Sequence, residues 1–168
     1  WDERDIHAWI EAWSQVAQYF KDEPFVLGYE IMNEPHDIAP DEARRILTRC
    51  LKAIREEDKR HIVFLSNHNW SHARSLEATW GEAASVVDAP YNNVAFTFHD
   101  YPEDNHPWEV QKSVTTFRDA HGVPVICTEF GATHWNKGET ACRTFLAGMH
   151  TLFAQEGIGW MIWALKRL

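Results

Sequence analysis

Residues 25–35 of the chain read Phe-Val-Leu-Gly-Tyr-Glu-Ile-Met-Asn-Glu-Pro, a nearly continuous apolar run that ends on polar residues. The run from Phe25 to Met32 predicts a β-strand buried on both faces, as strands of parallel sheets are. Before it, residues 3–20 place apolar side chains three and four positions apart, which predicts an amphipathic helix. After it, Pro40 and the acidic residues that follow predict the start of a second helix.

The same alternation of strand and helix continues to the end of the chain. Further strands are predicted at residues 61–66, 94–99, 124–129 and 158–165, and further helices at 107–120 and 139–156. Residues 67–93 are less regular, and we expect one short helix near residues 73–87. Strands that alternate with helices in this way form parallel β-α-β units, with the helices covering the sheet.

Both a doubly wound sheet and a (β/α)8 barrel fit this alternation. No glycine-rich phosphate loop follows any predicted strand, which disfavours a nucleotide-binding doubly wound sheet. Polar and aromatic residues crowd the strand ends instead, which read MNEP, SNHN, FHDYP, TEFGA and WALK. Barrel enzymes place their chemistry at these ends. The sequence therefore predicts an α/β fold of the (β/α)8 TIM-barrel type.

The predicted barrel is partial. A complete barrel takes about 250 residues, whereas this chain has 168 residues and about five predicted strands with flanking helices. The pattern begins with a helix that no strand precedes, and no helix follows the last strand, so the N-terminal strands and the final helix are missing from it. We expect residues 1–168 to form a single incomplete domain with two open sheet edges.

Composition excludes some classes of partner. The formal net charge of −9 argues against nucleic acid binding, which depends on clustered Lys and Arg. No apolar run approaches the roughly 20 residues that a membrane-spanning helix requires. The three cysteines, an odd number without metal-site spacing, are expected to be buried free thiols. Nine tryptophans are many for a chain of this length, and they predict either a large core or platforms for a flat ligand.

Two carboxylates occupy equivalent places in the pattern. Glu34 directly follows the first predicted strand, and Glu129 ends the fourth. Parallel strands of one barrel bring both side chains to the same rim. Hydrolysis of a glycosidic bond needs such a pair, one group to protonate the leaving oxygen and one to attack the sugar. The structural alternative is that Glu34 caps a turn before Pro35 and that Glu129 faces water.

Four motifs together resemble a known family. The motifs are GYEIMNEP (28–35), FHDY (98–101), CTEFGA (127–132) and GWMIWALK (159–166). They resemble the cellulase family, glycoside hydrolase family 5, within a clan of retaining (β/α)8-barrel glycosidases. The motifs occur in the family's order, and the resemblance covers the chain from about Trp9 to Lys166.

The resemblance implies a retaining endo-type hydrolase that cleaves β-linked glucan or a related polysaccharide by double displacement, without a cofactor. It implies that Glu34 is the general acid/base and Glu129 the nucleophile. Asn33 would bind the sugar 2-hydroxyl at the cleavage point. His99 and Tyr101 would position the carboxylates, with Tyr101 donating a hydrogen bond to Glu129.

Three tryptophans are candidate substrate platforms. The resemblance implies that Trp163 stacks under the sugar beside the cleaved bond. Trp70, in the SNHNWS segment, and Trp135, in the loop after Glu129, are further candidates because both follow strand ends. The family also contributes an Arg and a His from early strands that nothing in this chain matches. We therefore expect the chain alone to be weakly active or inactive.

Two rival functions remain open. A metal-dependent barrel enzyme could use Glu34, His99, Glu129 and either His68 or His134 as ligands, although no HxH or HExxH pair is present. A carbohydrate-binding barrel without catalytic activity would also fit. The pattern identifies no metal and leaves open the glycan, its linkage, endo or exo action, secretion and the oligomeric state.

Overall fold

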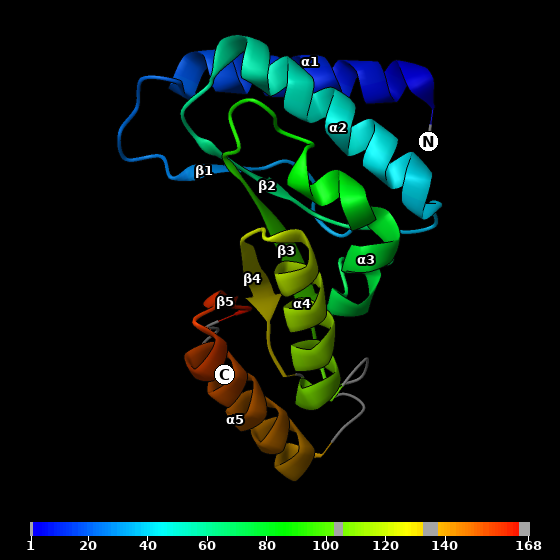
Figure 1. Ribbon diagram of the computed structural model, residues 1–168, viewed down its shortest axis with the longest axis vertical. Helices are drawn as coiled ribbons and strands as arrows, with labels where there is room; N and C mark the ends of the chain where they lie inside the picture. Colours follow the sequence, from blue (N-terminus) through cyan, green and yellow to red (C-terminus); the bar gives the residue numbers. More distant parts are fainter. Residues whose placement is uncertain (1, 103–105, 133–137, 165–168) are drawn as a thin grey trace.

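The computed structural model describes residues 2–102, 106–132 and 138–164. Five parallel strands form one sheet in the order β1-β2-β3-β4-β5, so each strand pairs with its neighbour in sequence. The sheet curves into a half-barrel with helices on its outside (Figure 1). The predicted partial (β/α)8 barrel is thus confirmed. The strands are β1 (Gly28–Glu30), β2 (Ile62–Leu65), β3 (Val94–Asp100), β4 (Val125–Phe130) and β5 (Gly159–Ile162).

The helices follow the predicted pattern closely. Predicted helices at 3–20 and 139–156 match the structure to the residue, because Asp2 caps the first and Gly157 ends the last in a left-handed turn. The irregular segment after β2 contains three short helical pieces where we predicted one. The helices are α1 (Glu3–Phe20), α2 (Pro40–Glu57), η1 (Ala73–Ser75), α3 (Leu76–Thr79), η2 (Gly81–Ser85), α4 (Pro107–His121) and α5 (Glu139–Glu156).

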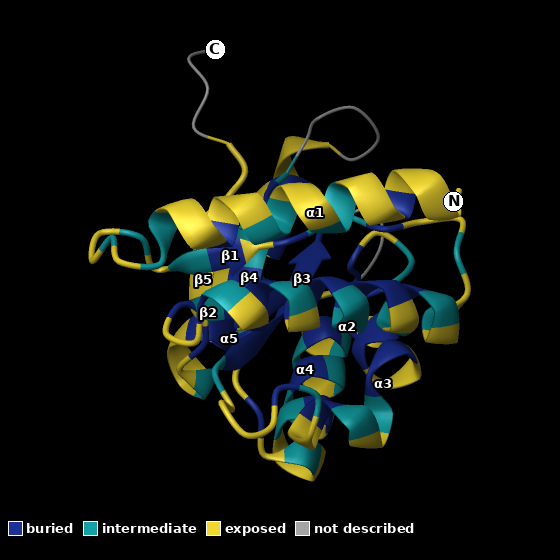
Figure 2. Cartoon of the chain, turned by 90° about the horizontal axis from the view of Figure 1, so that it is seen from above, coloured by how far each residue is buried: buried dark blue, intermediate teal, exposed yellow. Residues whose placement is uncertain are grey.

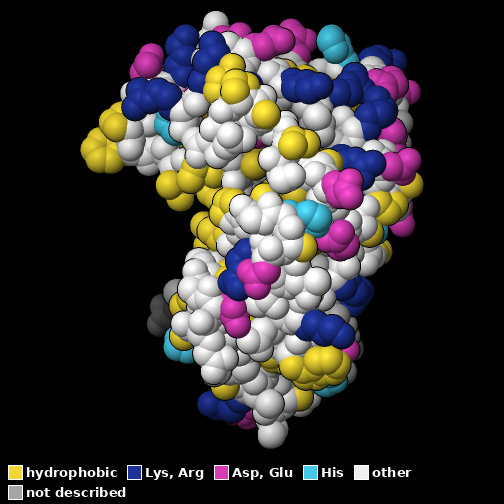
Figure 3. Space-filling view, viewed as in Figure 1, with side chains coloured by type: hydrophobic (Ala, Val, Ile, Leu, Met, Phe, Trp, Pro, Cys, Tyr) yellow, Lys and Arg dark blue, Asp and Glu magenta, His cyan; other side chains and the backbone are white. Residues whose placement is uncertain are grey.

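The first strand is shorter than predicted, and the expectation that it is buried on both faces is wrong at its start. Phe25 is 96% exposed and Leu27 is 64% exposed, and regular pairing begins only at Gly28. Strand β1 is one edge of the sheet, so the segment that leads into it has no neighbouring strand on one side among the described residues. All four residues of β5, the other edge, are exposed as well. Figure 3 shows hydrophobic side chains gathered around the hollow between the upper and lower parts of the molecule.

The core lies between the sheet and its helices. Strand β3 is buried along its whole length, and it runs through the centre of the molecule (Figure 2). Phe96 on this strand packs edge-on against Trp80 and Phe117, which joins β3 to α4 and to the segment after β2. The three cysteines are buried and form no disulfide, as predicted. On α1, by contrast, Val16 from the predicted apolar stripe is partly exposed.

A buried polar cluster stabilises the end of the barrel where the strands begin. The Arg55 guanidinium binds both carboxylate oxygens of Asp88, at 2.8 and 2.9 Å, and donates to the carbonyl oxygens of Asp58, His61 and Asn93. These contacts satisfy an arginine that is almost fully buried, which would otherwise be costly. The cluster therefore fixes α2 to the starts of β2 and β3, at the end opposite to the strand-end motifs.

We predict that Phe96→Ala lowers the free energy of unfolding by about 3–5 kcal/mol, because it leaves a cavity among Trp80, Phe117 and the sheet. Phe25→Ala is the matched control, because Phe25 is exposed and its removal is expected to change stability by less than about 0.5 kcal/mol. Denaturant unfolding of both variants measures the difference. Equal losses would show that the core is not centred on β3.

Candidate active site

The two predicted catalytic carboxylates lie at the rim formed by the carboxyl ends of the strands. Glu34 sits in the loop after β1 with a positive φ of 43°, a backbone conformation that a residue with a side chain adopts at some cost. Glu129 lies near the end of β4. The β3–β4 pairing shifts register between Phe98 and His99, and the shift places His99 opposite Glu129. Irregularities of this kind re-aim side chains at a sheet end.

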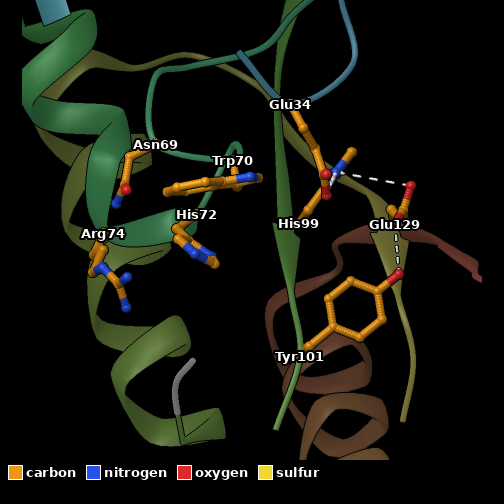
Figure 4. Close-up of a pocket in the computed structure, with 8 residues that line it drawn as sticks. All are labelled: Glu34, Asn69, Trp70, His72, Arg74, His99, Tyr101 and Glu129. Atoms are coloured by element: carbon orange, nitrogen blue, oxygen red, sulfur yellow. Dashed lines mark hydrogen bonds and ion pairs between the residues drawn. The ribbon is translucent and has the colours of Figure 1, made fainter. Parts of the chain in front are cut away.

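His99 connects the two carboxylates. Its Nδ1 lies 3.0 Å from Glu34 Oε1 and 3.9 Å from Glu129 Oε2. One ligand atom from each of these three residues lies within 4.8 Å of the others. Figure 4 shows the Glu34 and Glu129 side chains converging on the imidazole from two strand ends. Residues that are 95 positions apart in the sequence thus form one compact group.

Tyr101 donates its hydroxyl proton to Glu129 Oε1 at 2.5 Å, a distance typical of a strong bond to a charged acceptor. Partial burial, and secondly this hydrogen bond, raise the pKa of Tyr101. The phenol therefore stays protonated and remains a donor across the ordinary pH range. Its contact fixes the orientation of one oxygen of Glu129 while the other faces His99.

His99 is almost completely buried, yet its pKa is raised. Burial disfavours the charged imidazolium, but the nearby Glu30 carboxylate, the hydrogen bond to Glu34 and the charge of Glu129 outweigh that effect. The second ring nitrogen, Nε2, lies 3.0 Å from the hydroxyl oxygen of Thr128. Both nitrogens of the ring therefore have defined partners.

A cavity opens beside this group. Trp70 projects into it, about half exposed, with its ring stacked on His36 at 5.0 Å between centroids and 4° between planes. The Trp70 backbone N–H donates to the Pro35 carbonyl, which ties this loop to the one that carries Glu34. The cavity is lined by Glu34, Asn69, Trp70, His72, Arg74, His99, Tyr101 and Glu129.

The structure brings together five of the eight predicted site residues, namely Glu34, Glu129, His99, Tyr101 and Trp70. Asn33 is exposed beside Glu34 and is not among the residues that line the cavity.

Trp163 is also outside the cavity lining and is 59% exposed, directly after the edge strand β5. Its backbone N–H donates to the carbonyl oxygen of Phe130, and its own carbonyl passes so close to Gly131 that a Cβ there would lie 2.2 Å away. Trp135 and His134 lie outside the described residues. His68, a candidate ligand in the metal hypothesis, contacts Thr79 at 2.7 Å instead.

Sequence reasoning missed Asn69, His72 and Arg74, which line the cavity, and two residues around His99, namely Glu30 and Thr128. Asn69 lies in the SNHN segment that marked a strand end, so its position carried a usable signal. Glu30 carried another signal, because it is the only charged residue in the apolar run of residues 25–32. A charge inside a predicted buried strand calls for a partner.

A family model described as cellulase, glycosyl hydrolase family 5, matches residues 2–167. The chain belongs to this family. The assignment agrees with the geometry, since two carboxyl groups converge at the rim of a parallel half-barrel. Among the described residues, no helix is long and apolar enough to cross a membrane.

Three relatives of this cellulase-family chain show the extent of the similarity. Endoglucanase 1 of Robillarda sp. (strain Y-20) is 25% identical over 178 residues, covering 92% of this chain and 43% of the relative. An endoglycoceramidase of Cyanea nozakii is 28% identical, covering 96% of this chain and 34% of the relative. The crystal structure of endoglucanase Cel5A from the hyperthermophilic Thermotoga maritima matches with a TM-score of 0.81 and 20% identity, covering 98% of this chain and 60% of that one. The chain thus spans less than half the length of these two curated relatives.

We predict that Tyr101→Phe lowers kcat/KM for an aryl β-glycoside by roughly 10- to 100-fold, because the Glu129 carboxylate loses the hydrogen bond that the Tyr101 hydroxyl donates. Tyr91→Phe is the matched control, since Tyr91 precedes β3 and lies near Arg55 at the other end of the barrel. Steady-state kinetics of both variants measures the effect. Unchanged kinetics for Tyr101→Phe would mean that the Tyr101–Glu129 contact is not used in turnover.

Proposed function

We propose that the chain carries the two catalytic carboxyl groups of a retaining glycoside hydrolase, with Glu34 as general acid/base and Glu129 as nucleophile. The observation that carries the proposal is the closeness of the two side chains, with one oxygen of each within 4.8 Å. Retaining enzymes hold their carboxyl groups about 5–5.5 Å apart, whereas inverting enzymes hold them about 6.5–9.5 Å apart to admit a water. The separation thus supports direct attack by Glu129 on the sugar.

In the first step, Glu129 attacks the anomeric carbon while protonated Glu34 gives its proton to the leaving glycosidic oxygen. The C–O bond to the leaving sugar breaks, and a covalent glycosyl–Glu129 ester forms. In the second step, Glu34, now ionised, takes a proton from water, and the resulting hydroxide displaces Glu129 from the same carbon. Two inversions give net retention of configuration.

The neighbouring side chains suit these two roles. Tyr101 donates to Glu129, which holds one carboxylate oxygen still and leaves the other for attack. His99 contacts Glu34 through Nδ1 at 3.0 Å. The resemblance to the family further suggests that Asn33 binds the sugar 2-hydroxyl and that Trp163 stacks under the sugar next to the cleaved bond. Both stay predictions.

We propose a β-linked glucan or a related glycan as substrate, cleaved within the chain. The half-exposed ring of Trp70 beside the carboxylates suits stacking on the apolar face of a pyranose. One similar protein is described as an endoglucanase, which supports a glucan, and another as an endoglycoceramidase, which keeps a glycolipid sugar as the alternative. The net charge of −9 favours a neutral glycan over a polyanionic one.

The proposal is tested with Glu34→Gln and Glu129→Gln in the protein, with Glu82→Gln on the exposed surface of η2 as the matched control. We expect each active-site variant to lose at least roughly 10²–10⁴-fold in kcat/KM on cello-oligosaccharides, and the control to lose nothing. Proton NMR of the first product is expected to show retention of the anomeric configuration. Inversion would contradict the role of Glu129. Binding of cello-oligosaccharides with no cleavage by the full-length protein would favour a carbohydrate-binding barrel.

A metal-dependent reaction is the second candidate, because Glu34, His99 and Glu129 each offer a ligand atom within 4.8 Å of the others. Against it, both ring nitrogens of His99 and one oxygen of each carboxylate already have hydrogen-bond partners, including the Tyr101 hydroxyl on Glu129. We predict that dialysis against EDTA leaves kcat unchanged within error. Loss of activity that Zn²⁺ or Mn²⁺ restores would support the metal hypothesis instead.

A further inference from the structure

Glu30 is a third carboxylate at the rim, and the proposed mechanism does not use it. It ends β1, two-thirds covered, and its Oε1 accepts a hydrogen bond of 2.7 Å from the Thr128 hydroxyl on β4. The same oxygen lies 3.8 Å from His99 Nε2. Burial alone would raise the pKa of Glu30, but the nearby His99 ring and the hydrogen bond from Thr128 lower it. Glu30 is therefore an ionised group that only accepts hydrogen bonds at neutral pH.

Thr128 links Glu30 to His99. Its hydroxyl oxygen lies 2.7 Å from Glu30 Oε1 and 3.0 Å from His99 Nε2, and the hydroxyl has a single proton to donate. Because an ionised carboxylate cannot donate, the Thr128 proton points to Glu30. The hydroxyl oxygen is then left as an acceptor for the ring, so His99 Nε2 must carry a hydrogen.

We propose that Glu30 and Thr128 keep Nε2 of His99 protonated, so that the nitrogen which gains and loses a proton is Nδ1, facing Glu34 at 3.0 Å. The inference rests on the proposed function only in the role given to Glu34. Glu30 and Thr128 are positioning residues in this scheme, because they act on Glu34 through the imidazole. The charged or titratable groups that face the ring are Glu30, Glu34 and Glu129.

This arrangement fits both forms of the acid/base. When Glu34 is ionised, a protonated Nδ1 donates to its Oε1. When Glu34 is protonated and the ring is neutral, the bare Nδ1 accepts from it. Going from one pairing to the other moves a single proton across the 3.0 Å contact and changes no other bond. The opposite neutral tautomer would always donate to Glu34 and would hold it in the ionised form, which cannot protonate a leaving group.

Histidine ring nitrogen NMR tests the tautomer directly, without any need for turnover. The protein is labelled with ¹⁵N in histidine, and the His99 signals are identified by their loss in His99→Asn. We expect the neutral ring of the unsubstituted protein to be protonated on Nε2. A neutral ring protonated on Nδ1 would overturn the inference, and this measurement depends on no other variant folding.

Substitutions then test which residues set the tautomer of His99. Glu30→Gln keeps the size of the side chain but supplies an amide N–H that can donate to Thr128, which frees the Thr128 proton to donate to Nε2. Thr128→Val removes the hydroxyl. Both are expected to give a neutral ring protonated wholly or partly on Nδ1. Thr128→Ser, which keeps the hydroxyl, and Glu82→Gln are the matched controls and are expected to match the unsubstituted protein. Unchanged tautomers in both Glu30→Gln and Thr128→Val would overturn the assignment.

Kinetics gives an independent readout that loss of stability alone would not move. We expect the alkaline limb of the kcat/KM–pH profile to shift to lower pH by about one unit in Glu30→Gln and Thr128→Val, since a donating Nδ1 favours ionised Glu34. Thr128→Ser is expected to restore the profile, and an unshifted limb in both variants counts against the inference. If a full-barrel form of the protein cleaves no glycan, the proposed function fails, whereas the ring tautomer still decides the present inference.

Discussion

The parallel pairing of β3 with β4 is the interaction on which the site depends. One strand carries His99 and leads into Tyr101, and the other carries Thr128 and Glu129. The register shift after Phe98 sets His99 beside Glu129. The Nδ1 atom of His99 then faces Glu34, which lies in the loop after β1. Because β3 is buried along its length, these polar groups are held by the best-packed strand of the molecule. The core thus fixes the positions of groups that exchange protons in the proposed mechanism.

Much of the fold could be predicted from sequence because its signals are local. The amphipathic stripes give the helices, and prolines and glycines such as Pro40 and Gly157 mark where they begin and end. The positions of the strands were predicted well, but their burial was not. Phe25 and Leu27 are apolar and yet exposed, because β1 is a sheet edge and the local pattern does not reveal which strands lie at an edge.

The site was predictable only in part. Glu34, His99, Tyr101 and Glu129 sit at strand ends in recognisable motifs, so the parallel topology was enough to bring them together. Thr128 and Glu30 could not be placed, because their contact with His99 depends on register shifts in β3 and β4 that leave no mark in the sequence. His72 and Arg74 depend on the loop after β2, where residues 69–71 all have positive φ. Three such residues in succession are too unusual for turn statistics to anticipate.

The positive φ of Glu34 sets folding against chemistry at a single residue. A side chain in such a conformation costs about 1–2 kcal/mol, and glycine would avoid most of that cost. For stability alone, glutamate is thus a poor choice at this position. Under the proposed role of Glu34 as acid/base, the protein gives up this stability in exchange for a side chain that can transfer a proton.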